Sequence, residues 1–190
     1  MLFMSLVLGG CTSLETAFPS SHSSLNQDDA KQGYEALASA TLCCQRYADI
    51  SYQPLGEGKE INLTIDHASP VYPFPEGKSY FAAYRLPENK GSFTIDVSSF
   101  FAKSVFIPQV LLLDGNFNVT RTIKADAFKY LEPKLIRAEQ YTSALTVDRS
   151  REGNVNNETY LIIYTPAEQL LKNSVVDSEE MRYAKSRALA

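Results

Sequence analysis

Hydrophobic and polar residues alternate along two short segments of the chain. Residues 61–65 place Ile, Leu and Ile between Asn and Thr, and residues 92–97 place Phe, Ile and Val between Ser, Thr and Asp. Successive side chains of a strand point to opposite faces of a sheet, so each segment predicts a strand with one buried face. We expect both strands to lie at an edge or on the outside of the fold.

Residues 104–113 are apolar at nearly every position, which predicts a central strand that is buried on both faces. Pro108 lies inside this segment and cannot donate a hydrogen bond to a neighbouring strand, so we expect a bulge there. The pair Asp114-Gly115 then predicts a hairpin turn that leads into a strand at residues 119–123.

Further strands are predicted at residues 80–86, 141–147 and 158–164, where aromatic and β-branched residues are concentrated. The total is about seven short strands with no alternation of strands and helices. This pattern predicts a mainly β fold, specifically an antiparallel β-sandwich of the jelly-roll kind.

Helices are predicted only at the two ends of the folded region. Apolar residues recur at helical spacing from Asp28 onward, which predicts a short N-terminal helix. Thr165-Pro166-Ala167-Glu168 combines a capping residue with a proline at the first helical position, so we expect a helix through residue 172 and another from residue 177 or 178. The N-terminal stripe consists of Ala30, Tyr34, Leu37, Ala38, Thr41 and Leu42.

The composition is that of a globular protein, with 44% hydrophobic and 21% charged residues among 190. We expect a single β-sandwich domain with flanking helices at residues 28–190, preceded by a flexible Ser-rich tether at residues 11–27. The formal net charge of −4 argues against nucleic acid as a partner, because phosphate binding requires clustered basic residues.

The tetrad Leu8-Gly9-Gly10-Cys11 follows a short apolar run and resembles the box at which bacterial lipoproteins are processed. The resemblance implies a signal peptide at residues 1–10, cleavage before Cys11 and a diacylglycerol on its thiol, which would attach the protein to a membrane. Thr12 resembles the pattern of outer-membrane lipoproteins, so we expect the protein in the periplasm and attached to the outer membrane. A short buried helix that ends in a cysteine is the alternative.

Cys43 and Cys44 are adjacent, and thiols in an oxidising compartment are seldom left there without a role. They are candidates for a vicinal disulfide. Two buried thiols, placed where the helix meets the first strand, are an equally open interpretation. A catalytic pair is not favoured, because the chain has no Cys-x-x-Cys motif.

The sequence offers little for catalysis. Its two histidines are His22, in the predicted tether, and His67, in a predicted loop, and no Gly-x-Ser-x-Gly motif accompanies them. The pair Asp66-His67 lacks the spaced partners that a zinc site needs. We therefore predict no enzyme activity, no catalytic residue, no metal and no cofactor. Carboxylates at Asp96, Asp114 and Asp148 are expected in solvated turns, although a pair for glycoside cleavage depends on distances that a sequence does not contain.

Residues 105–114 read Val-Phe-Ile-Pro-Gln-Val-Leu-Leu-Leu-Asp, which resembles a strand motif of the maltose operon periplasmic protein family (MalM). The resemblance implies an envelope protein that is encoded with genes for maltose and maltodextrin uptake and has no defined activity. Longer members of the family continue through an Ala/Pro-rich linker into a further segment, and we expect this chain to lack the function of that segment. The resemblance extends from about residue 43 to the C-terminus and includes Tyr84-Arg85-Leu86-Pro87, residues 92–97, residues 160–165 and Tyr183-Ala184-Lys185.

Sugar sites are commonly lined by aromatic rings, and this chain has no Trp. Tyr72 and Phe74 lie among Pro70, Pro73 and Pro75, which would keep their loop stiff, so they are candidate sugar-binding residues. The alternative, which buried aromatic residues adopt more often, is that both rings close the open end of the sandwich.

Together these features predict a non-enzymatic, lipid-anchored periplasmic accessory protein of carbohydrate transport. Its partners would be the membrane, through the N-terminal lipid, and maltodextrin or a component of maltose uptake. The alternative is a structural or assembly lipoprotein of the envelope that binds proteins rather than sugars.

Overall fold

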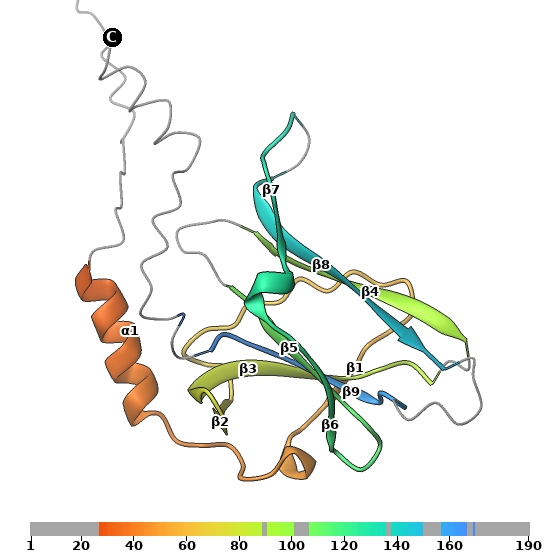
Figure 1. The fold of residues 1–190 in the computed structure, drawn as a ribbon. Coiled ribbons are helices and arrows are strands. Elements are labelled where there is room, and N and C mark those ends of the chain that lie inside the picture. Colours follow the sequence, from red (N-terminus) through yellow and green to blue (C-terminus); the bar gives the residue numbers. More distant parts are fainter. Residues whose placement is uncertain are drawn as a thin grey trace, which may run out of the picture.

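The computed structural model describes residues 27–88, 91–100, 107–135, 138–149, 157–166 and 169. Within these residues the protein is mainly β, with one α-helix at its N-terminal end (Figure 1). In chain order the elements are α1 (Gln27–Ser39), the 3-10 helix η1 (Tyr47–Asp49), β1 (Gln53–Pro54), β2 (Val71–Phe74), β3 (Gly77–Arg85), β4 (Ser92–Phe100), β5 (Gln109–Leu113), β6 (Val119–Ile123), the 3-10 helix η2 (Ala125–Ala127), β7 (Lys129–Leu131), β8 (Gln140–Asp148) and β9 (Tyr160–Tyr164).

Two sheets pack against each other as a sandwich (Figure 1). The larger sheet has the strand order β1-β3-β9-β5-β6, with β2 paired to β3, and the smaller sheet has the order β4-β8-β7. All pairs are antiparallel except the short parallel pair of β1 and β3. The predicted mainly β sandwich is therefore confirmed.

The central strands β5 and β9 of the large sheet are buried on both faces, because each face supports its own hydrophobic cluster. In β9, Leu161 and Ile163 belong to a cluster that also includes residues of the small sheet, whereas Ile162 and Tyr164 belong to a cluster on the opposite face. The first cluster consists of Tyr84, Leu86, Val97, Val110, Leu112, Phe128, Leu145, Val147, Leu161 and Ile163. The second consists of Ile50, Tyr72, Phe74, Phe81, Ala83, Leu111, Leu113, Ile162 and Tyr164.

The predicted central strand is confirmed in its described part. β5 lies between β9 and β6, and all five of its residues are buried. The predicted bulge at Pro108 is wrong, because Pro108 precedes the strand and the register shift falls between Leu112 and Leu113. Residues 101–106 lie outside the described residues.

The strand predicted at residues 61–65 is wrong. The segment has no ladder partner, and Ile61 and Leu63 are exposed, while Ile65 packs against the first cluster. Alternation shows which side chains favour burial, but a strand also needs a neighbour for its backbone groups. The strand expected at residues 119–123 is present with those ends, and the strands expected at residues 80–86, 92–97, 141–147 and 158–164 are present with shifted ends. The structure adds β1, β2 and β7, which are too short to leave a clear pattern in the sequence.

The N-terminal helix is present as α1 but ends earlier than its apolar stripe suggests. Of that stripe's described side chains, only Leu37 is buried; Tyr34, Ala38, Thr41 and Leu42 are exposed. At the end of the helix, Lys78 of β3 donates through Nζ to the carbonyl oxygens of Ala38 and Ala40. A cation at this position stabilises the negative end of the helix.

Several predictions concern parts of the chain outside the described residues. They include the signal peptide, most of the tether and nearly all of the predicted C-terminal helices; at the start of the first of these, Gln169 donates its backbone N–H to the carbonyl of Pro166. In the described part of the chain, no helix has both the length and the apolar character needed to cross a membrane.

Candidate functional site

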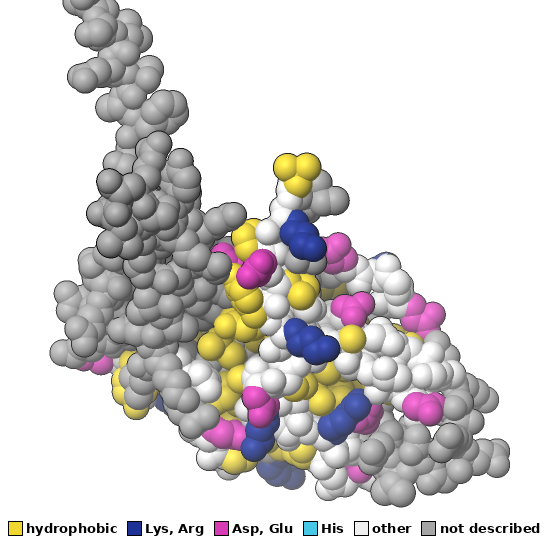
Figure 2. All heavy atoms as spheres, turned by 45° about the horizontal axis from the view of Figure 1, so that its top comes forward, with side chains coloured by type: hydrophobic (Ala, Val, Ile, Leu, Met, Phe, Trp, Pro, Cys, Tyr) yellow, Lys and Arg dark blue, Asp and Glu magenta, His cyan; other side chains and the backbone are white. Residues whose placement is uncertain are grey.

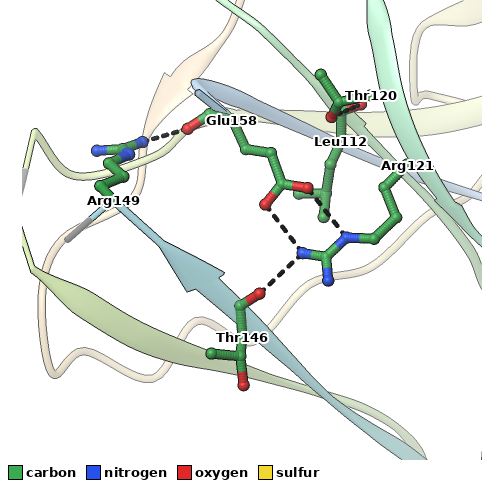
Figure 3. A network of polar contacts seen from close by, with 6 residues as sticks. All are labelled: Leu112, Thr120, Arg121, Thr146, Arg149 and Glu158. Carbon is green, nitrogen blue, oxygen red and sulfur yellow. Dashed lines mark hydrogen bonds and ion pairs between the residues drawn. The ribbon is translucent and has the colours of Figure 1, made fainter. Parts of the chain in front are cut away.

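A buried carboxylate forms an ion pair where β6 approaches the start of β9. Arg121 of β6 donates through Nε to Oε1 of Glu158 at 3.0 Å and through Nη2 to Oε2 at 2.9 Å (Figure 3). The Glu158 side chain is 3% exposed, whereas that of Arg121 is 36% exposed. Nη2 also donates to the carbonyl of Thr146 in β8, so the pair joins the two sheets.

A bulge directs Arg121 toward this carboxylate. In the pairing of β5 with β6, Leu112 is opposite Arg121 and Leu113 is opposite Val119, so Thr120 is an extra residue in β6. The Thr120 hydroxyl donates to the carbonyl of Leu112 at 2.9 Å, which replaces the missing ladder contact. Bulges of this kind commonly change the direction of a neighbouring side chain.

A second arginine binds the backbone of the same segment. Arg149, immediately after β8, donates to the carbonyl oxygen of Glu158 (Figure 3). It also donates to the carbonyl oxygen of Pro87, and its guanidinium carbon lies 5.5 Å from the centre of the Phe93 ring. The described residues therefore place two cations around the chain just before β9.

Burial controls the electrostatics of these groups. It raises the pKa of Glu158 above its ordinary value of 4.5, against the opposing effect of Arg121. It also lowers the pKa of Arg149, although a guanidinium remains charged at any physiological pH. A buried carboxylate without its cation would cost several kcal/mol, so Arg121 is required for this arrangement.

The network fixes the chain that leads into β9. Next to Glu158, Thr159 donates its N–H to the carbonyl of Leu113 at 2.6 Å and accepts from the N–H of Leu86 at 2.8 Å. Tyr160 then begins β9, opposite Leu113 of β5 and Arg85 of β3. The ring of Tyr160 is thereby held beside the turn that connects β5 to β6.

That turn is organised by one carboxylate. Oδ1 of Asp114 accepts the backbone N–H groups of Asn116 at 2.8 Å and Asn118 at 2.9 Å, and Oδ2 accepts the side-chain amide of Asn118 at 2.9 Å. Hydrogen bonding by Asn118, followed by that of Asn116, lowers the pKa of Asp114 below its ordinary value. The predicted hairpin is confirmed, with a turn longer than the pair Asp114-Gly115 alone suggests.

Phe117 has a backbone conformation that few residues of its type adopt. Its φ is 64°, in the left-handed region, and it is the sole non-glycine residue there within the described part of the chain. The conformation costs about 1–3 kcal/mol for a residue other than Gly. Its N–H donates to the carbonyl of Asp114 at 3.1 Å, which closes the turn around the strained position.

Three half-buried rings meet at this end of the molecule, and we call Tyr52, Phe117 and Tyr160 the aromatic platform. Phe117 stacks on Tyr160 with centroids 4.7 Å apart and an interplanar angle of 13°. Tyr52 lies 4.4 Å from Tyr160 and 5.9 Å from Phe117. Figure 1 shows why residues so distant in sequence meet, because η1 and the β5–β6 turn lie at the same end of the sandwich.

The platform is uncharged and its surroundings are polar. Burial raises the pKa of Tyr52, whose hydroxyl donates to the carbonyl of Tyr47, so this ring stays neutral at physiological pH. Asn116 and Asn118 are exposed on either side of Phe117. Figure 2 brings the other end of the molecule, the top of Figure 1, forward; on that face Lys and Arg lie among Asp, Glu and hydrophobic side chains, with no large patch of one sign among the described residues.

Tyr72 and Phe74 lie in the second hydrophobic cluster. Tyr72 is 6% exposed and Phe74 is 3% exposed, and Phe74 stacks on Tyr164 with centroids 3.7 Å apart. The Tyr72 ring stacks on Tyr47, and its hydroxyl donates to the carbonyl of Gln45. These contacts leave little of either ring for a ligand.

Cys43 and Cys44 are joined by a disulfide in the segment that follows α1. The N–H of Cys43 donates to the carbonyl of Val71 at 2.9 Å, and Cys44 packs against the second cluster. The bridge therefore belongs to the connection that covers one face of the large sheet.

The remaining candidates do not form a common site. His67 is exposed in a turn in which Asp66 Oδ1 accepts the N–H of Ala68, and His22 lies outside the described residues. Asp96 and Asp148 belong to strands of the small sheet, whereas Asp114 follows a strand of the large one. Among the side chains that the structure describes, no three of His, Cys, Asp or Glu are grouped so as to hold a metal ion.

None of the three platform residues was predicted from the sequence. Tyr52 and Tyr160 are 108 positions apart, so no local pattern connects them. Phe117 did leave a local feature, because an aromatic residue between two asparagines after Asp-Gly is unusual in a turn composed of polar residues. No local sequence feature indicated the Arg121–Glu158 pair.

Comparison with known proteins agrees with the resemblance seen in the sequence. A "Maltose operon periplasmic protein" from Escherichia coli K12 is 28% identical over 152 residues, which cover 79% of this chain and 47% of that protein. The protein of the same name from Salmonella typhimurium LT2 is 27% identical over 106 residues, covering 55% of this chain and 34% of its own length. The chain thus spans less than half the length of these curated relatives.

No solved structure matches the chain. The family model "Maltose operon periplasmic protein precursor (MalM)" matches residues 76–190, which include the β5–β6 turn, the Arg121–Glu158 pair and two of the three platform residues. This match covers more than half of the sequence, and the chain therefore belongs to the MalM family of maltose operon periplasmic proteins.

Proposed function

We propose that this protein is a lipid-anchored accessory protein of maltodextrin uptake in the periplasm, which binds the sugar without cleaving it. The observation that carries sugar binding is the aromatic platform, where half-buried neutral rings meet beside exposed amides. Sugar sites combine these two groups, because apolar faces of pyranose rings pack on aromatic rings and hydroxyls bind amides. The names of the two relatives support the maltose operon and the periplasm as the setting.

The absence of cleavage is part of the proposal. The sequence supplies no nucleophile motif, and the carboxylate of Asp114 is occupied by the N–H groups of its own turn. Anchoring is proposed from the Leu8-Gly9-Gly10-Cys11 tetrad, which lies outside the described residues.

The test is binding and chain-length analysis on purified protein. We expect maltose, maltotriose or longer maltodextrins to raise the unfolding temperature, since a ligand at 100 times its dissociation constant adds about 2.7 kcal/mol to stability. The recovered sugars should keep their chain lengths. New reducing ends that disappear in Asp96→Asn or Asp148→Asn would replace the binding role with hydrolysis. A lack of any shift with every maltodextrin would argue against sugar binding.

A second candidate is a protein that binds other proteins of the envelope. It is favoured by residues 61–65, which alternate like a strand, have no ladder partner and expose Ile61 and Leu63 by 43% and 39%. Crosslinking in intact cells would distinguish the two functions. Adducts formed through a photoreactive residue at position 63, together with a lack of response to maltodextrins, would favour the protein partner.

A further inference from the structure

We infer that the β5–β6 turn is a stacking subsite for one glucose ring of an α-linked glucan, and that Phe117 is the residue that receives it. The inference rests on the proposed sugar binding and adds its location and its principal contact. A left-handed position in a turn normally holds Gly or Asn, and this turn contains Gly115, Asn116 and Asn118, yet Phe117 has the φ of 64°. Strain of this kind is concentrated at functional sites.

The ring at the strained position is supported from behind. One face of Phe117 lies on Tyr160, and Tyr160 in turn contacts Tyr52. Tyr160 is fixed through Thr159 and the buried Glu158, so the support extends to the ion pair in Figure 3. The Phe117 ring is only half-buried, so part of it remains accessible to a ligand. A ring held in this way loses little conformational freedom on binding, which favours affinity.

The groups around the ring select a neutral, hydroxylated ligand. Asn116 and Asn118 flank Phe117, and the amide of Asn118 is oriented by its bond to Asp114 Oδ2. Amides both donate and accept hydrogen bonds, as sugar hydroxyls do. The carboxylate of Asp114 in the same turn disfavours phosphate or carboxylate ligands. The preference for an α-linkage comes from the proposed function and is tested with a β-linked sugar.

The test is titration calorimetry of the full chain with maltotetraose, with cellotetraose as the β-linked comparison. The main variant is Phe117→Asn, because Asn adopts left-handed backbone readily and keeps the turn while removing the ring. We expect Phe117→Asn to weaken maltotetraose binding about tenfold or more, and Phe117→Tyr to retain it within about threefold. The matched control is Phe100→Asn, which removes an aromatic ring that is 53% exposed on the small sheet and should leave affinity unchanged.

A measurement on the unmodified protein accompanies the variants. Maltotetraose should shift the NMR signals of residues 52, 114–118 and 160, and not those of residues 71–74. If the wild type binds maltotetraose but Phe117→Asn binds it equally well, or the shifts lie elsewhere, this assignment is wrong and the proposed function stands. If Phe100→Asn weakens binding as much as Phe117→Asn, the assignment is likewise wrong. If the wild type binds neither sugar, the inference and the proposed sugar binding fail together.

Discussion

Glu158 places a carboxylate between the two sheets, and the ion pair with Arg121 stabilises its buried charge. The Glu158 side chain is nearly inaccessible to solvent, whereas that of Arg121 is partly exposed. Removing Arg121 should therefore lower the free energy of unfolding more than removing Glu158 does, because only the loss of Arg121 leaves a buried charge without its ion-pair partner. The exposed pair of Arg46 and Asp49 has similar bidentate geometry on the surface.

We predict that Arg121→Met lowers the free energy of unfolding by about 3 kcal/mol or more, because it leaves the buried Glu158 carboxylate without its hydrogen-bonded ion-pair partner. Adding Glu158→Gln should recover part of the loss. Urea denaturation at constant m-value measures both effects. Arg46→Met is the matched control and should change the urea midpoint little, since its pair is exposed. Equal effects of the two arginine substitutions would mean that burial does not determine the strength of the Arg121 pair.

The turn carboxylate of Asp114 makes stability depend on pH. Its pKa is lower in the folded protein than its ordinary value of 3.8, so the unfolded chain binds the proton more readily. The stabilisation is complete above the ordinary value and is lost as the pH falls through the lower, folded value. We predict that the stability difference between wild type and Asp114→Asn shrinks as the pH falls from about 5 through the lowered pKa of the folded protein. Parallel stability curves for the two proteins would contradict the assigned role of Asp114.

At the scale of elements, the apolar run predicted β5, an interior strand whose residues are all buried, and alternation predicted most of the others. It failed at residues 61–65, where the pattern is as regular as in β4 but no strand lies alongside. Alternation records the preference of side chains, while strand formation depends on a partner supplied by another part of the chain. The same limit explains why the short strands β1 and β7 were not predicted.

We predict that Leu112→Ala in β5 lowers the free energy of unfolding by about 2–5 kcal/mol, because the side chain is fully buried in the cluster between the sheets. Leu135→Ala is the matched control. Its side chain is fully exposed beyond β7, and the same substitution should change stability by about 0.5 kcal/mol or less. A denaturation midpoint for Leu112→Ala close to that of Leu135→Ala would show that β5 contributes less to the core than its burial indicates.

At the scale of the whole molecule, the large sheet is covered on both faces by different parts of the chain. The small sheet covers one face, and the segment from Cys44 to Tyr52 covers the other together with Tyr72 and Phe74 of β2. The polar network joins the sheets at the end where β9 begins. This arrangement places the aromatic platform at the edge of the second cluster, where the rings of Tyr52 and Tyr160 are only partly covered.

We predict that Cys11 carries the lipid by which the protein is attached to a membrane. Cys11→Ser should move the protein from the detergent-extracted membrane fraction to the soluble periplasmic fraction. The double variant Cys43→Ser, Cys44→Ser is the matched control and should remain with the membrane, because it removes two cysteines without touching the lipid box. Membrane association that persists in Cys11→Ser would refute the anchor.

The sequence by itself determined the fold class and the central strand, because burial on one or both faces produces a periodic pattern in neighbouring residues. It also determined the family, through the motif at residues 105–114. Only the tertiary structure decided which aromatic residues form a surface and which form a core. Tyr72 and Phe74 looked available beside their prolines but are covered by Tyr164 and Tyr47, while Tyr52 and Tyr160 come together from distant segments. The exposed part of a ring depends on what packs against it, and those neighbours are selected by sheet pairing across the whole chain.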